Sequence, residues 1–118
     1  MPKSDSLGQF EQLVLTAVVS LGDNAYGVSV HKKVDDLLAP KSVTLAAVYV
    51  TLDRLERKGH LSSWLSEPTA ERGGRTKRCY AIEASGERAL KDAMAAARRM
   101  AAAVAPVWGA STKNWGKA

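Results

Sequence analysis

The sequence predicts one small domain, mainly α-helical with a single β-hairpin, in the element order α-α-α-β-β-α. Apolar residues recur at helical spacing in four segments of the chain, and two short segments before the last of them alternate at strand spacing. The 118 residues are enough for one compact core and too few for two. With 46% hydrophobic and 25% charged residues, the composition is that of an ordinary globular protein.

The first two helices are expected over residues 7–21 and 26–38. One apolar stripe of the first comprises Phe10, Leu13, Val14, Ala17, Val18 and Leu21. Ser6 followed by Gln9 has the form of a capping box that would start this helix. The apolar side of the second comprises Tyr26, Val30, Val34, Leu37 and Leu38. Pro40 is expected to end it.

The third helix, expected over residues 45–58, has two distinct faces. Thr44 is a suitable N-cap and Gly59 a suitable end. Its core stripe comprises Leu45, Val48, Leu52 and Leu55. At about 100° per residue, the opposite face carries Ala46, Ala47, Val50, Arg54 and Arg57, with Tyr49 on the flank. Because exposure of apolar side chains to water is unfavourable, this second face predicts a contact with another molecule.

A basic hairpin is expected next, because residues 60–66 and 77–83 both alternate. The densest positive patch is RGGRTKR, residues 72–78, which contains Arg72, Arg75, Lys77 and Arg78 and no acid. Residues 41–80 carry eight Lys/Arg against four Asp/Glu, whereas residues 1–40 carry three against five. Such a cluster attracts phosphate backbones or anionic membranes, although a solvated loop is the simpler interpretation of a cluster taken alone.

The fourth helix is expected from near Ser85 to Ala105, with Pro106 ending it. Along it, Leu90, Met94, Ala97, Ala101, Val104 and Trp108 are spaced like the seam of a coiled coil. Because Ala97 and Ala101 are small, two copies of this helix could approach closely. The spacing thus favours a homodimer, and packing of the helix on its own domain is the alternative.

Together these elements predict a winged helix-turn-helix. Residues 1–83 would form a DNA-binding domain, residues 84–106 a dimerisation helix, and residues 107–118 a tail without periodicity that could be disordered. The third helix would enter the major groove of double-stranded DNA, where Val50 could meet thymine methyls and Arg54 a guanine or a phosphate. A winged helix used for protein or RNA contact is the alternative.

The stretches LVLTAVVSLGDNAYGVSV, TLAAVYVTLDRLERKGHL, EPTAERGGRTKRCYAIEASG and the following ERAL, roughly residues 7–90, resemble the PadR family of bacterial transcriptional regulators. The match is to its small subfamily with a single C-terminal helix. The resemblance implies a homodimer, joined through that helix, that represses genes at pseudo-palindromic operators. It also implies that Tyr49 contacts DNA and that the basic wing follows the backbone or minor groove. Where the family commonly has threonine, this chain has Glu83, so Ser85 is expected to cap the last helix instead.

With the resemblance added, two sets of residues are expected to form interfaces. The DNA-binding set is Thr44, Ala46, Ala47, Tyr49, Val50, Arg54, Arg72, Arg75, Lys77 and Arg78. The dimer set is Leu90, Met94, Ala97, Ala101 and Val104. For Tyr49, burial as part of the core stripe is the alternative. A small-molecule effector could bind near Trp108 and Trp115, for which apolar packing or an unstructured tail is the simpler interpretation.

No enzyme, cofactor or metal is expected. His31 and His60 stand without partners at metal-ligand spacing, and Cys79 is expected to be a packed small residue. Gly73 and Gly74 lack the lysine and serine or threonine of a phosphate-binding loop. The sequence contains no apolar run long enough to span a membrane and no signal peptide, so a cytoplasmic protein is expected.

Overall fold

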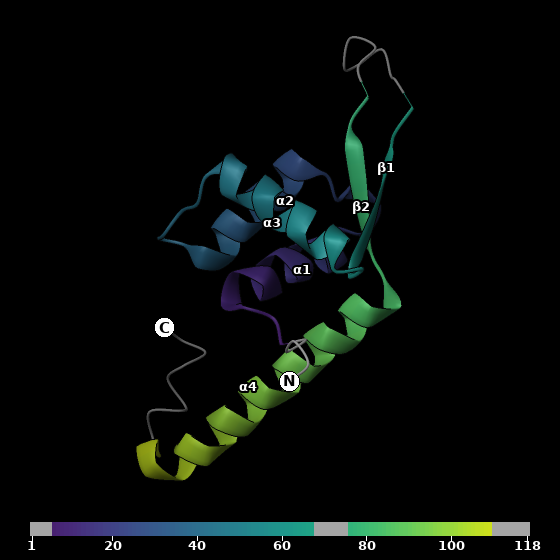
Figure 1. Cartoon of the computed structure of the whole chain (residues 1–118). Coiled ribbons are helices and arrows are strands. Elements are labelled where there is room, and N and C mark those ends of the chain that lie inside the picture. Colours follow the sequence, from purple (N-terminus) through teal and green to yellow (C-terminus); the bar gives the residue numbers. More distant parts are fainter. Residues whose placement is uncertain (1–5, 68–75, 110–118) are drawn as a thin grey trace.

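The structure, a computed structural model, describes residues 6–67 and 76–109. Its helices are α1 (Gln9–Leu21), α2 (Gly27–Leu38), α3 (Leu45–Arg57) and α4 (Ala84–Trp108), with a short 3-10 helix η1 (Gly22–Asn24). Its strands are β1 (Leu61–Leu65) and β2 (Arg78–Ile82). Figure 1 shows α1, α2 and α3 gathered in one group, from which the hairpin and α4 extend. The predicted fold class is therefore confirmed.

The hydrophobic core lies where the first three helices meet. Its largest fully buried side chains are Leu15, Leu52, Leu55, Val14, Val18, Val30, Val34 and Val48. Leu15 is completely buried although it lies outside the predicted stripe of α1. The reason is that α1 contacts α2, α3, β2 and α4, so its buried arc is wider than one stripe.

The start of α1 and the end of α4 differ from the sequence-based expectation. The predicted capping box at Ser6 is wrong, because α1 begins after Gly8, whose N–H donates to Glu11 Oε1 at 3.0 Å. Pro106 does not end α4, which continues to Trp108. The helix ends instead at Gly109, which adopts φ 46° and donates its N–H to the Ala105 carbonyl at 2.8 Å.

The start of α4 is tied to the turn that follows α3. Glu83 occupies the N-cap position without a side-chain cap bond, so the expected cap by Ser85 is wrong. The Ser85 hydroxyl donates to the Gly59 carbonyl at 2.9 Å, and its oxygen lies 3.0 Å from Nδ1 of the buried His60. A Cβ atom on Gly86 would overlap with the His60 carbonyl. The first turn of α4 is thus seated firmly on the domain.

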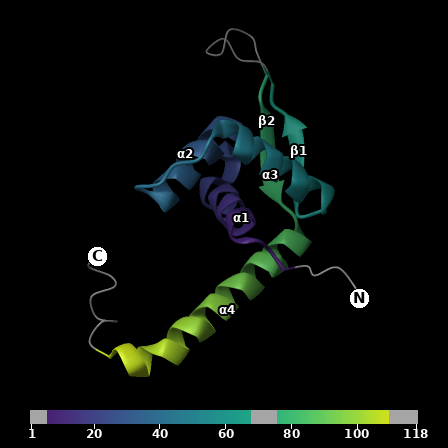
Figure 2. The same cartoon turned by 60° about the vertical axis from the view of Figure 1, so that its left-hand side comes forward.

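The hairpin is antiparallel, with a register that runs from Leu61 opposite Ile82 to Leu65 opposite Arg78. Its second strand also bridges to the segment before α2, because Tyr26 pairs with Cys79 and the Tyr80 N–H donates to the Ala25 carbonyl at 2.9 Å. Cys79 is buried, as expected. In both views the hairpin and α4 leave the three-helix group in opposite directions (Figures 1 and 2).

Candidate nucleic-acid interface

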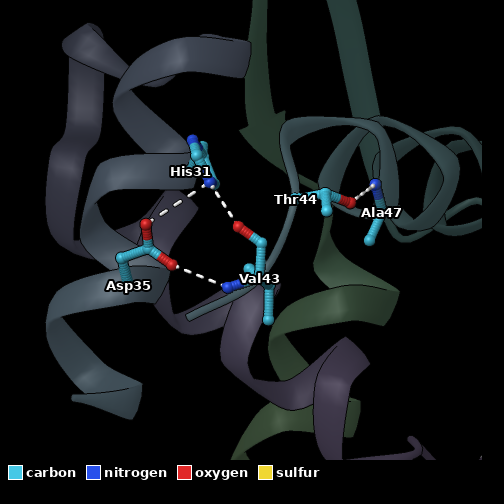
Figure 3. A network of polar contacts seen from close by, with 5 residues as sticks. All are labelled: His31, Asp35, Val43, Thr44 and Ala47. Atoms are coloured by element: carbon cyan, nitrogen blue, oxygen red, sulfur yellow. Dashed lines mark hydrogen bonds and ion pairs between the residues drawn. The ribbon is translucent and has the colours of Figure 1, made fainter. Parts of the chain in front are cut away.

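Polar contacts lock the turn between α2 and α3 (Figure 3). Asp35 Oδ1 accepts the Val43 N–H at 2.9 Å, and His31 Nε2 donates to the Val43 carbonyl at 2.7 Å. Because a carbonyl oxygen only accepts, Nε2 must carry the hydrogen; Asp35 Oδ2 lies 3.4 Å from it. Both partners come from α2, so these bonds set the angle at which α3 starts. No role was expected for His31 from the sequence, and its i,i+4 spacing to Asp35 was the available signal for this contact.

Thr44 caps α3, as predicted, with its Oγ1 accepting the Ala47 N–H at 3.0 Å. This bond satisfies one of the helix's orphan N–H groups. Thr44 is exposed, and in the bond from Ala47 its hydroxyl oxygen serves only as an acceptor. The residue can therefore cap the helix and still donate to an external acceptor.

The side of α3 that faces away from the core is exposed. We call it the outer face of α3, and it comprises Ala46, Ala47, Tyr49, Val50 and Arg54. Val50 is 55% exposed and Tyr49 is 44% exposed, whereas the neighbouring Val48 and Leu52 are fully buried. The structure therefore brings the predicted residues of α3 together on one surface, of which Ala47 is half-buried.

Tyr49 lies at the edge of this face, against the start of α2. A Cβ atom added to Gly27 would overlap with the hydroxyl and ring of Tyr49. The side chain is thus packed on one side and exposed on the other, so it does not extend the buried stripe of α3. Nearby, burial raises the pKa of the Tyr80 hydroxyl, and the positive charge of Arg78 opposes that rise.

Two of the four predicted wing cations lie within the described residues, and both are oriented. The Lys77 ammonium lies 3.6 Å from the centroid of the Tyr26 ring. Arg78 Nη1 donates to Ser63 Oγ at 2.8 Å, and that hydroxyl donates to Glu56 Oε2 at 2.7 Å. The other two predicted cations, Arg72 and Arg75, lie outside the described residues.

A partly buried ion pair attaches the end of α3 to α1. Lys58 Nζ donates to Glu11 Oε2 at 2.7 Å, and the Glu11 side chain is only 8% exposed. Burial raises the pKa of Glu11, but hydrogen bonds from Lys58 and Gly8 and the charges of Lys58 and Arg54 outweigh it, so the pKa lies below its usual value. The sequence analysis missed this pair, whose partners are 47 residues apart.

The predicted dimer residues divide into two groups. Leu90 is 7% exposed and belongs to the core of its own chain. The remaining four form what we call the outer seam of α4: Met94, Ala97, Ala101 and Val104. Met94 is 47% exposed, the two alanines are exposed, and Val104 is half-buried. A groove of about 650 Å³ lies beside this seam, lined by Leu7, Ala93, Ala96, Ala97 and Met100 among others.

Metal-binding clusters and membrane-spanning helices are both absent from the described part of the chain. Residues 6–67 and 76–109 contain no group of three His, Cys, Asp or Glu side chains that could hold a metal ion. No helix within these same ranges combines the length and hydropathy needed to cross a membrane.

The turn held between α2 and α3, the exposed outer face of α3 and the adjoining β1–β2 hairpin define a winged helix-turn-helix protein. A family model, the transcriptional regulator PadR-like family, matches residues 14–92, which is more than half of the chain. This protein therefore belongs to the PadR-like family of transcriptional regulators.

Solved structures agree on the fold. A PadR family transcription regulator from hypervirulent Clostridium difficile R20291 has a TM-score of 0.69 and 20% identity, over 86% of this chain and 100% of that one. A PadR family regulator from Eggerthella lenta DSM 2243 has a TM-score of 0.66 and 22% identity, over 86% and 83%. Bacillus subtilis PadR in complex with operator DNA has a TM-score of 0.61 and 17% identity, over 72% and 46%. No curated protein sequence matches the chain significantly.

Proposed function

We propose that this protein binds specific sequences of double-stranded DNA as a homodimer and represses transcription at a pseudo-palindromic operator in the cytoplasm. The observation that carries the proposal is the outer face of α3, where exposed small apolar side chains adjoin Arg54 and where Tyr49 rests on Gly27, next to the Tyr26 ring that lies against the Lys77 ammonium. This mixture suits a DNA groove, in which thymine methyls lie between acceptor atoms and phosphates.

The residues of α3 divide the work of recognition. Ala46 and Ala47 permit close approach to the base edges, and the exposed Val50 can contact a thymine methyl. Arg54 can donate two hydrogen bonds to one guanine, a contact that discriminates between bases by about 1–3 kcal/mol. Thr44 and Tyr49 have hydroxyl groups at the margins of this face, where phosphates run.

The wing contributes charge. Lys77 and Arg78, together with Arg72 and Arg75 of the same RGGRTKR stretch, can each neutralise a phosphate and release counterions. Such contacts position the protein without reading bases. The related Bacillus subtilis PadR structure is a complex with operator DNA, which supports a DNA-binding role for this fold.

The proposed dimer joins the outer seams of two α4 helices, in line with a division into residues 1–83 and 84–106. Met94 exposes 47% of its surface, and the exposed Ala97 and Ala101 allow close approach of a second copy. The adjacent groove, whose lining includes Ala93 and Met100 as well as the charged Arg88 and Asp92, could receive part of the same partner. Trp108 is 51% exposed at the end of the seam, where an aromatic effector that relieves repression could stack.

Selection of bound duplexes from a random pool tests the proposal. We expect enrichment of sequences with two half-sites related by a dyad, since a twofold dimer presents two α3 helices. Arg54→Ala should relax the preference at one position of each half-site. Lys91→Ala, which removes the same charge from an exposed position on α4, is the matched control and should leave the selected sequence unchanged. Equal binding of all duplexes, or stronger binding of single-stranded RNA, would contradict the proposal.

A further inference from the structure

The two residues at the start of α2, Tyr26 and Gly27, contact two residues that are proposed to bind DNA. These come from different elements: Tyr49 from α3 and Lys77 from the base of the wing. The Tyr26 ring lies under the Lys77 ammonium, 3.6 Å away, and Gly27 lies under the Tyr49 ring. We call residues 26 and 27 the Tyr26–Gly27 step.

The backbone of this step is held in two ways, within the first turn of α2 and by β2. The Tyr26 N–H donates to Ser29 Oγ at 3.0 Å, which closes the first turn of α2. Tyr26 pairs with Cys79 of β2. The preceding carbonyl, that of Ala25, accepts the Tyr80 N–H at 2.9 Å. A step fixed in this way can serve as a reference point for side chains that rest on it.

Space explains why residue 27 is glycine. Gly27 is not among the described glycines with positive φ, which are Gly22, Gly59 and Gly109, so its backbone does not require glycine. It is buried, and a Cβ atom there would overlap with three atoms of Tyr49. The absence of a side chain therefore lets the Tyr49 ring lie directly on the start of α2.

We propose that the Tyr26–Gly27 step is a positioning element of the DNA-binding surface. Gly27 sets where the Tyr49 hydroxyl lies, and Tyr26 holds the Lys77 ammonium beside α2. A lysine that is already held loses less rotamer freedom when it meets a phosphate, and its other N–H donors stay accessible beside the ring. The step thereby fixes the distance between α3 and the base of the β1–β2 hairpin. The inference rests on the proposed function, and it requires neither residue of the step to touch DNA.

Thermal unfolding without DNA tests the Gly27 contact itself. Gly27→Ala should lower the melting temperature in the native background, because the ring must move aside. In the Tyr49→Ala background it should raise the melting temperature, because alanine is the better helix former and the obstacle is gone. The same change of sign is not expected if Gly27 serves only the backbone. Equal shifts in both backgrounds would therefore overturn the Gly27 contact.

Affinity for the tightest duplex from the random pool tests the consequence. Gly27→Ala should weaken binding about tenfold, the scale of one misplaced hydrogen bond to a charged group, and less than twofold when Tyr49 is already alanine. Tyr26→Leu should weaken binding about two- to fivefold when Lys77 is present and leave it unchanged in the Lys77→Ala background. Tyr26→Phe, which keeps the ring, is the control and should bind like the native protein.

The outcomes separate the two proposals. If the native protein binds its selected duplex and Gly27→Ala and Tyr26→Leu both bind equally well, the positioning role is overturned while the proposed function stands. Losses that are the same in every background assign the step a general structural role and also overturn it. If the native protein selects no duplex, both proposals fall together.

Discussion

Helix α3 buries one whole face in the core, whereas α4 buries residues only in its first turns, and the exposed faces of the two helices differ in chemistry. The outer face of α3 combines small apolar side chains with Arg54, and the same helix is linked to Arg78 through the Glu56–Ser63–Arg78 hydrogen bonds. The outer seam of α4 has Met94 and two alanines, flanked by the 67% exposed Met100. Cations beside small side chains match phosphates and base edges, whereas flexible apolar side chains match another apolar surface.

The two helices also differ in how they are attached. Contacts along its length hold α3 in place: the His31 and Asp35 bonds to Val43 at its start and the Glu11–Lys58 pair at its end. In contrast, α4 is seated by its first turns, through Ser85, Gly86 and Leu90, and then leaves the domain (Figure 1). A helix that binds in a DNA groove, as proposed for α3, needs a fixed orientation. A helix that extends from the domain, as α4 does, can reach a second copy of the chain. The exposed faces thus predict partners of different kinds, and substitutions can test each.

The largest effect is expected from Ala101→Glu on the outer seam of α4. In the proposed dimer the new carboxylate would be buried twice across a symmetric contact, at a cost of several kcal/mol for each ion. Sedimentation should show a monomer, and binding to a palindromic duplex should weaken with it. Ala102→Glu, at an exposed position of α4 that faces away from both the outer seam and the adjacent groove, is the control and should remain dimeric. A dimer that survives Ala101→Glu would place the interface elsewhere.

The next effect concerns Tyr49→Phe, which keeps the ring on Gly27 and removes only the hydroxyl. If that hydroxyl contacts a phosphate, duplex affinity should fall by roughly 1.5–3 kcal/mol while the melting temperature holds. Fluorescence anisotropy with the selected duplex measures the first quantity and calorimetry the second. Normal affinity in a stably folded Tyr49→Phe protein would remove Tyr49 from the DNA-binding set and leave the outer face of α3 with one polar ligand fewer.

The sequence alone was enough to predict the faces of α3, because a period of 3.6 residues sorts Val48 and Leu52 from Ala46 and Val50 without knowledge of any partner. It also predicted the hairpin, from alternation. It could not predict contacts between distant segments, such as Glu11 with Lys58 or Gly27 with Tyr49. No local pattern encodes those pairs.

Local rules also failed where a neighbouring residue supplied a better solution. Glu11 accepts the N–H of Gly8, and this bond moves the start of α1 beyond Ser6. Pro106 lies within α4, which continues to Trp108 and ends where Gly109 adopts a positive φ of 46°. Ser85, the expected cap, is engaged by Gly59 and His60 instead.

Acid should weaken the attachment of the end of α3 to α1. The pKa of Glu11 is lowered in the folded protein, so the Glu11–Lys58 pair stabilises the fold above the ordinary glutamate pKa, 4.5, and this contribution disappears as pH falls through the folded value. Because Lys58 is 39% exposed, we expect a loss of only about 1 kcal/mol. The free energies of unfolding of the native protein and of Glu11→Gln, measured with denaturant, should differ at pH 7 and become equal at low pH. A constant difference at all pH values would assign the stabilisation to something other than this charge.

The smallest effect is expected from Arg78→Ala, and its form matters more than its size. Arg78 is exposed at the start of β2, where its Nη1 donates to Ser63 Oγ and its charge can serve a phosphate. Removing one phosphate contact should reduce the slope of log affinity against log salt by roughly 0.9, and should weaken binding to all duplexes alike. Arg78→Lys keeps the charge and should restore the slope. Titrations at several salt concentrations, on the selected duplex and on a scrambled one, measure both quantities. A loss confined to the selected duplex would mean that the wing reads bases, and the contrast between a base-reading helix and a backbone-following hairpin would then fail.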